Sequence, residues 1–157
     1  MSDTQVKAKS PTQMLRQDHR TVQELFAEYA KLGGRDLPEK VRLFQEIHRA
    51  LTIHSEIEER LFYPTVRDVR TDDAEDIVNE AVDAHQGVST LLEELVDLEV
   101  GSDPFEAQMK VLRDYVGRHV TEEEKSMFPL EAKLPKGAQE SLLIEMESLR
   151  SDLEDEQ

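Results

Sequence analysis

One eleven-residue pattern occurs twice in this chain of 157 residues, 65 positions apart. The copies are HSEIEERLFYP, which begins at His54, and HVTEEEKSMFP, which begins at His119. Both hold a His, a Glu four residues later, a second Glu at five, an aromatic residue at nine and a Pro at ten. A His and a Glu four residues apart lie on one face of an α-helix, about 40° from each other. The duplication therefore predicts two related helical segments, each of which presents an imidazole and a carboxylate to the same volume.

Cap and turn signals divide the chain into four long helical segments and a shorter fifth. Ser10-Pro11 opens the first, which runs to Gly33-Gly34, and Asp36 to Pro38 opens the second. The range 71–73 opens the third, and the range 101–104 closes it and opens the fourth. Each long segment carries apolar residues at three-four spacing, and none alternates as a strand would. We expect an all-α fold: an antiparallel up-down four-helix bundle with a short fifth C-terminal helix.

This organisation predicts one domain with two extensions. We expect residues 1–10 to form a flexible tail, residues 11–132 the bundle, and residues 133–157 the C-terminal helix and its tail. In the last segment Leu142, Met146 and Leu149 fall on one side.

Six polar residues occupy seam positions where leucines would be expected. Antiparallel helices place two residues at one level when both lie equally far from the connecting turn. The midpoint of His19 and His54 lies near position 36, that of His85 and His119 at position 102, and that of Glu58 and His85 near position 71. Each midpoint falls inside a predicted turn, so all six residues are expected in one layer. Buried without partners, such groups would cost several kcal/mol each, whereas metal ions would satisfy them. The predicted metal ligands are His19, His54, Glu58, His85, His119 and Glu123.

Composition limits the metal and the partners. The chain has no cysteine, so the ligands are nitrogen and oxygen atoms, which suits a two-metal carboxylate site with iron, or with manganese or zinc instead. His48 lies about 240° round the helix from His54 and is predicted not to bind metal. The net charge of −16 repels phosphate, so we expect no nucleic acid partner. No apolar run approaches the roughly 20 residues of a membrane span, and we expect a soluble, cytoplasmic protein.

From His19 to Pro129 the pattern resembles the hemerythrin-like HHE cation-binding domain family. The resemblance implies a four-helix bundle around a non-haem di-iron centre with an oxo or hydroxo bridge. By position, His19 and His54 would bind one iron, His85 and His119 the other, and Glu58 and Glu123 would bridge them. The oxygen-carrying hemerythrins have one more histidine ligand, and the candidate positions here hold Ala81 and Ser89. About one coordination place would then stay open on each iron.

Three classes of function are consistent with this ligand set. The first is an enzyme that decomposes peroxide or reduces nitric oxide. The second is a sensor or store for oxygen, nitric oxide or iron without turnover, or an iron-centre repair protein. The third is a helical interaction module with a structural metal. The expected partner is a small diatomic or peroxide ligand, and the expected state is a monomer or weak homodimer. Tyr115 is interpreted as a further ligand, a proton donor or a packing residue, and Glu59 and Glu124 as residues that orient ligands or face solvent.

Overall fold

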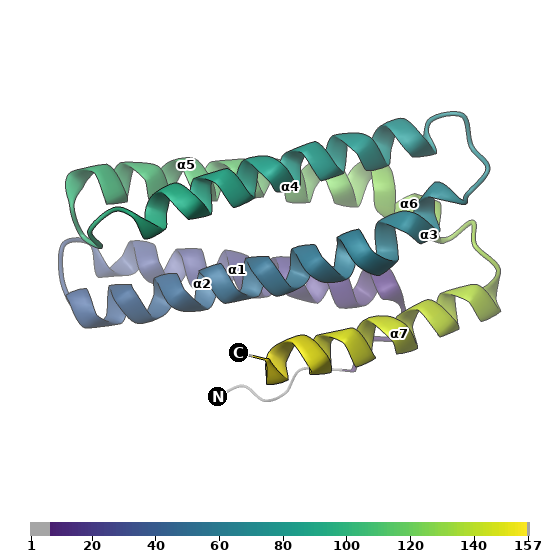
Figure 1. The fold of residues 1–157 in the computed structure, drawn as a ribbon, viewed down its shortest axis with the longest axis horizontal. Coiled ribbons are helices and arrows are strands. Elements are labelled where there is room, and N and C mark those ends of the chain that lie inside the picture. The colour runs from purple at the N-terminus through teal and green to yellow at the C-terminus, as the bar shows by residue number, and fades with distance from the viewer. Residues whose placement is uncertain (1–6, 157) are drawn as a thin grey trace.

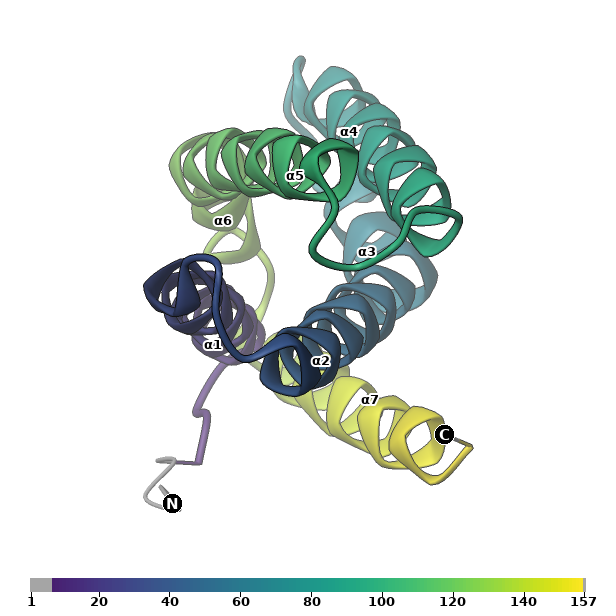
Figure 2. The ribbon, with the colours of Figure 1, turned by 90° about the vertical axis from the view of Figure 1, so that its left-hand side faces the viewer.

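The computed structural model describes residues 7–156, and within that range the regular structure is helical throughout. Four long helices run up and down in succession: α1 (Pro11–Leu32), α2 (Leu37–Ile57), α4 (Ala74–Val96) and α5 (Asp103–Glu122) (Figure 1). Figure 2 looks along the bundle and shows these four helices around a common interior. The predicted all-α four-helix bundle is confirmed.

A fifth helix, α7 (Lys136–Asp155), lies outside the bundle and packs against α1 and α2 (Figure 2). It extends over 20 residues. Its buried side chains are Leu142, Met146 and Leu153, and Leu149 is half-buried beside them. The second half of the bundle, α4 and α5, therefore has no comparable cover from this helix.

Helix starts fall where the cap residues predicted them. The Ser10 hydroxyl accepts a hydrogen bond from the amide of Gln13 at 3.1 Å, and α1 begins at Pro11. At the start of α2 the Asp36 carboxylate accepts a hydrogen bond from the amide of Glu39, and at the start of α5 the Ser102 hydroxyl accepts one from the amide of Phe105. These side chains satisfy amide groups that the first helical turn leaves without partners. Residues 1–6 of the predicted tail lie outside the described residues, while Ala8 is buried against the bundle.

Both copies of the repeated pattern leave α-helical geometry at the same place. A π-helical turn, η1 (Glu58–Phe62), follows α2, and a second, η2 (Glu123–Met127), follows α5. Short helices α3 (Tyr63–Arg67) and α6 (Phe128–Glu131) then continue each segment, with proline in their first turn. Proline crowds the carbonyl group four residues before it, and a wider turn just ahead of it relieves that contact.

The apolar core is divided into two clusters along the bundle axis. One lies toward α3, α6 and α7 and includes Leu15, Ile57, Phe62 and Met127. The other lies toward the α1–α2 and α4–α5 turns and is built from residues such as Phe26, Ile47, Leu95, Phe105 and Leu112. Polar residues of the seams are buried between these clusters. None of the helices in residues 7–156 is long and apolar enough to cross a membrane.

Candidate metal centre

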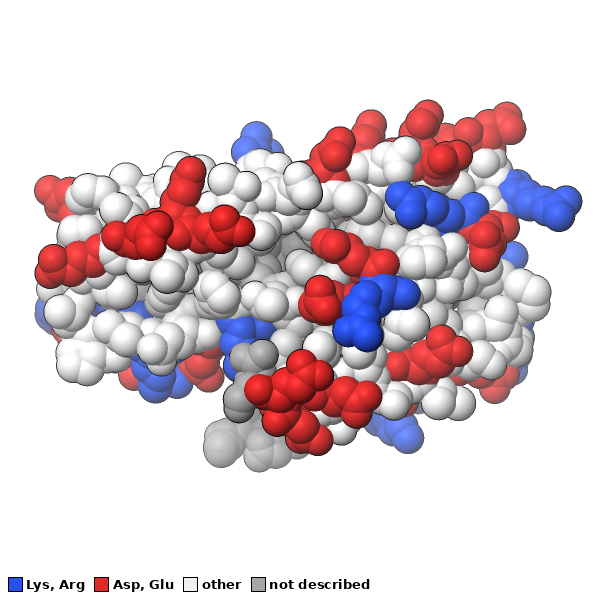
Figure 3. Space-filling view, viewed as in Figure 1, with Lys and Arg blue, Asp and Glu red and all other residues white. Residues whose placement is uncertain are grey.

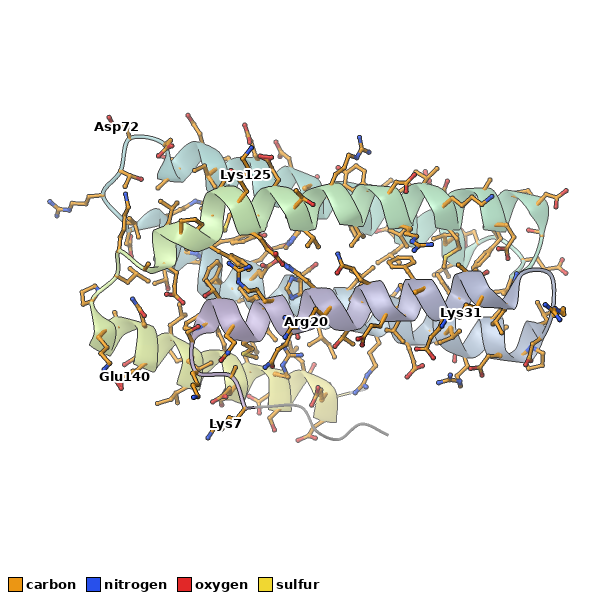
Figure 4. All side chains as sticks on the ribbon, turned by 180° about the vertical axis from the view of Figure 1, so that it is seen from behind. Lys7, Arg20, Lys31, Asp72, Lys125 and Glu140 are labelled. Carbon is orange, nitrogen blue, oxygen red and sulfur yellow. The ribbon has the colours of Figure 1, made fainter. Side chains whose placement is uncertain are left out.

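The six predicted seam residues converge in the bundle interior. Figure 4 shows side chains with nitrogen and oxygen atoms between the helices of the bundle. They form two overlapping groups, and within each group the four ligand atoms lie within 4.8 Å of one another. The first group is His19, His54, Glu58 and Glu123, and the second is Glu58, His85, His119 and Glu123. Both groups contain both carboxylates. Glu58 and Glu123 therefore lie between two pairs of histidines.

Several of the atoms that face the centre of this layer lack hydrogen-bond partners. His19 Nε2 lies 3.0 Å from Glu123 Oε1, and His54 Nε2 lies 3.1 Å from Glu58 Oε1, but neither pair has hydrogen-bond geometry. Buried polar atoms of this kind are rare because each costs about 1–3 kcal/mol. Nitrogen lone pairs and carboxylate oxygens that crowd together without hydrogen bonds are suited to hold cations. The buried unpaired atoms of the layer are His19 Nε2, His54 Nε2, His119 Nε2, Glu58 Oε2 and Glu123 Oε1.

Carboxylates outside the layer orient three of the four imidazoles. Glu124 lies 2.7 Å from Nδ1 of His19, and Glu59 lies 2.7 Å from Nδ1 of His85. A proton donated from Nδ1 to a carboxylate leaves Nε2 with a free lone pair directed inward. The structure thus shows Glu59 and Glu124 as orienting residues, which was one of the two interpretations of their position next to the ligands.

The outer partner of His54 was not predicted from the sequence. Asp18 lies 2.8 Å from Nδ1 of His54 and is held in turn by Arg150 of α7, whose Nη2 is 2.6 Å from Asp18 Oδ2. Burial alone would raise the pKa of Asp18, but the contacts with His54 and Arg150 lower it. The C-terminal helix therefore reaches the polar layer through a chain of two charged side chains.

Tyr63 is a second site residue that the sequence did not reveal. Its side chain is buried, with 1% of the residue exposed, and its hydroxyl donates to Glu123 at 2.6 Å. The same oxygen lies 3.1 Å from Glu58 Oε1 and 3.0 Å from His85 Nε2. The corresponding residue of the second copy is Phe128, whose ring stacks on His19 at 5.6 Å. The two halves of the layer thus differ at this position by one hydroxyl group.

Comparison with known proteins agrees with this architecture. Residues 10–130 match the family described as the hemerythrin HHE cation binding domain. The chain belongs to this family. A crystal structure of an HHE cation binding domain-containing protein from Mycobacterium kansasii has the same fold, with a TM-score of 0.75 and 21% identity over 92% of this chain and 90% of that one.

A protein named DNA nickase from Nostoc sp. (strain PCC 7120 / SAG 25.82 / UTEX 2576) is 31% identical over 116 residues. The match covers 73% of this HHE chain and 31% of the nickase. The chain therefore spans about a third of the length of that relative.

The two shared carboxyl groups of this HHE domain have opposite electrostatic environments. Burial alone would raise the pKa of Glu58, but the imidazoles of His54 and His85 hold it well below its usual range. Burial and the neighbouring charge of Glu58 raise the pKa of Glu123 to about 7. In the metal-free pair the negative charge therefore resides on Glu58 in preference to Glu123.

The pKa values of the buried imidazoles of the HHE domain shift in both directions. Burial lowers the pKa of His119 to about 4. It would do the same to His85, but hydrogen bonds to Glu58 and Glu59 raise the pKa of His85 to about 9. The charge of Glu58 and the hydrogen bond to Asp18 likewise raise the pKa of His54 well above its usual value. A cation that enters the layer must therefore displace protons.

Two residues considered in the sequence lie outside the layer. His48 is half-buried with its ring 6.1 Å from that of Phe44, and it belongs to neither group. Tyr115 packs across Gly87 of α4, where an added Cβ atom would fall 2.1 Å from the phenolic oxygen. Tyr115 thus makes a packing contact with α4, and it also lines the space between α4 and α5 beside His119.

Proposed function

We propose that this HHE domain binds two metal ions in the buried layer, with iron as the natural metal and manganese or zinc as alternatives. His19 and His54 would hold one ion, His85 and His119 the other, and Glu58 and Glu123 would contribute to both. The observation that carries the proposal is the overlap of the two groups, since a carboxylate has two oxygens and can serve two cations at once. The unpaired nitrogen atoms of three histidines support it.

We further propose that the centre handles a small uncharged molecule: peroxide, nitric oxide or dioxygen. When bound, a di-iron pair would supply the electrons that reactions of these molecules require, and the chain has no cysteine thiol to supply them. The surrounding residues bury most of the layer, and Glu59, Glu124 and Asp18 fix three of the four imidazoles. Tyr63 holds a proton on its phenolic oxygen, 2.6 Å from Glu123, and is the proton donor best placed for the centre.

Nucleic acid is not a partner in this proposal, although one relative is named a DNA nickase. The net charge of −16 opposes phosphate binding, which requires a surface rich in Lys and Arg. On the face shown in Figure 3, acidic side chains are spread along the molecule, and Lys and Arg occur only in small separate groups.

The proposal is tested by loading the protein with iron anaerobically and adding, in separate experiments, hydrogen peroxide alone or nitric oxide together with excess ascorbate as the reductant. Repeated consumption of either molecule would identify an enzyme. A reversible spectral change without consumption would identify a carrier or sensor. A loaded protein that shows neither response would contradict the proposal and favour a helical module with a structural metal.

A further inference from the structure

The two halves of the polar layer are related by the repeated sequence. His19 corresponds to His85, and His54 corresponds to His119. The outer carboxylates also correspond: Glu124 of the second half hydrogen-bonds to His19 of the first, and Glu59 of the first half hydrogen-bonds to His85 of the second. A position that departs from this correspondence is therefore informative, because the two halves show what the fold allows with and without a given side chain.

The correspondence fails at the outer partner of the second histidine. His54 is held by Asp18, the residue just before His19. The residue just before His85 is Ala84, and among the described residues no side chain hydrogen-bonds to Nδ1 of His119. Where the first half has a carboxylate covered by Arg150 of α7, the second half has a methyl group and no helix outside it.

A cavity of about 350 Å³ lies at this place, between α4 and α5. Its apolar lining includes Ile77, Ala81, Ala84 and Met127, and it reaches His119 and Glu123. With 10% of its side chain exposed, His119 is also the most accessible of the six residues. A cavity of similar size between α2 and α4 is lined by His85 and its partner Glu59 but by neither shared carboxylate. Among these cavities, the one beside Ala84 leads to the centre.

The lining of the cavity indicates what it can bind. Its outer part carries Glu80, Arg118 and Glu122, so an anion would meet an excess of negative charge. The apolar walls beneath them disfavour charged groups of either sign. Its volume is about ten times the roughly 30 Å³ that one water molecule occupies in the liquid, so it has room for more than a diatomic molecule.

We propose that this cavity is the substrate site of the protein and that, in addition to the diatomic and peroxide ligands proposed above, it binds an uncharged molecule in which a nitrogen or oxygen donor is joined to a compact apolar group. The donor would point toward His119 and Glu123, and the apolar group would lie against Ala81 and Ala84. The inference rests on the proposed metal centre and adds to it the route of access, the half of the centre that is reached, and the class of ligand.

The test uses the protein loaded with Co²⁺, whose visible absorption reports changes in its ligands, and pyridine as the uncharged probe. Pyridine should bind at least tenfold more tightly than nicotinate, the same ring with a carboxylate. Ala84→Leu should fill the cavity and raise the dissociation constant of pyridine at least tenfold while the cobalt content stays unchanged. The matched control is Ala50→Leu, which fills the groove beside Asp18 in the other half and should leave pyridine binding within twofold of wild type.

Unchanged pyridine binding in Ala84→Leu, or equal losses in both variants, would overturn the assignment of the cavity. Tighter binding of nicotinate than of pyridine would overturn the ligand class. If Ala84→Leu does not fold, alanine-methyl NMR of the wild-type protein loaded with Zn²⁺ provides the test, because pyridine should shift the signals of Ala81 and Ala84 and not that of Ala50. Failure to take up Co²⁺ would instead contradict the proposed metal centre itself.

Discussion

Replacement of Tyr63 by Phe should destabilise the metal-free protein, because it removes one hydroxyl group from the centre of the buried layer. The ring would stay in place, as Phe128 does in the other half. The single phenolic proton can be donated to one carboxylate at a time, and a hydrogen bond to a charged group contributes about 1.5–3 kcal/mol. At pH 8, above the pKa of about 7 of Glu123, the acceptor is ionised and the 2.6 Å bond belongs to the strong end of that range, so we expect a loss of about 2–3 kcal/mol.

For a chain of this size, 1 kcal/mol shifts the melting temperature by about 2–4 °C, so the loss corresponds to about 4–12 °C. The assay is urea and thermal unfolding in the presence of a chelator, followed by far-UV circular dichroism. Tyr115→Phe is the control, since the Tyr115 hydroxyl makes no hydrogen bond among the described residues and its removal should cost less than about 0.5 kcal/mol. Equal stabilities of the two variants would refute the role assigned to Tyr63.

Three further predictions concern the outer partners, the C-terminal helix and pH. Glu59→Gln or Glu124→Gln should weaken metal binding about 10- to 100-fold in competition with a chromophoric chelator, and unchanged affinity would contradict an orienting role. Met146→Ala should cost about 2–5 kcal/mol in urea unfolding, whereas Ile144→Ala, at an exposed position of the same helix, should cost under about 0.5 kcal/mol. Because the pKa of His85 is raised to about 9, native metal-free protein holds this proton more tightly than the unfolded chain, so stability should fall from pH 7 to 9. Metal displaces the same proton, and the stabilisation by Zn²⁺ should therefore grow over that interval; a parallel pH dependence with and without Zn²⁺ would count against this view.

The features that the sequence predicted depend on local rules and on regular helical geometry. Ser10, Asp36 and Ser102 cap helices because a short polar side chain can reach a free amide two or three residues away, which needs no tertiary information. The six polar residues could be placed in one layer because α-helices rise by a constant amount per residue and the turns between them are short.

Tyr63 was missed because the helix is not regular at that point. Nine residues of α-helix turn through about 900°, which would place Tyr63 opposite His54. The π turn at Glu58–Phe62 delays the winding by about one residue, or 100°, and brings the ring back toward the interior. The aromatic residue and the proline repeated at offsets nine and ten were the only sequence signal of this irregularity.

Asp18 and Arg150 were missed for a different reason. They are 132 residues apart and meet only because α7 folds back along α1. Helical periodicity locates a side chain on its own helix, but it does not specify where a helix outside the bundle will dock. The cavity beside Ala84 could not be predicted for the same reason, since it reflects the absence of a side chain and of a covering helix.

The central claim is that six side chains hold two metal ions, and it is tested most directly by counting the metals bound per chain. Protein reconstituted with ferrous iron and freed of excess metal should contain two irons per chain, as should His48→Ala. His54→Ala and Glu123→Ala should each contain fewer, with a matching loss of thermal stability. Fewer than two irons in the wild-type protein, or equal iron content in all three variants, would contradict the claim.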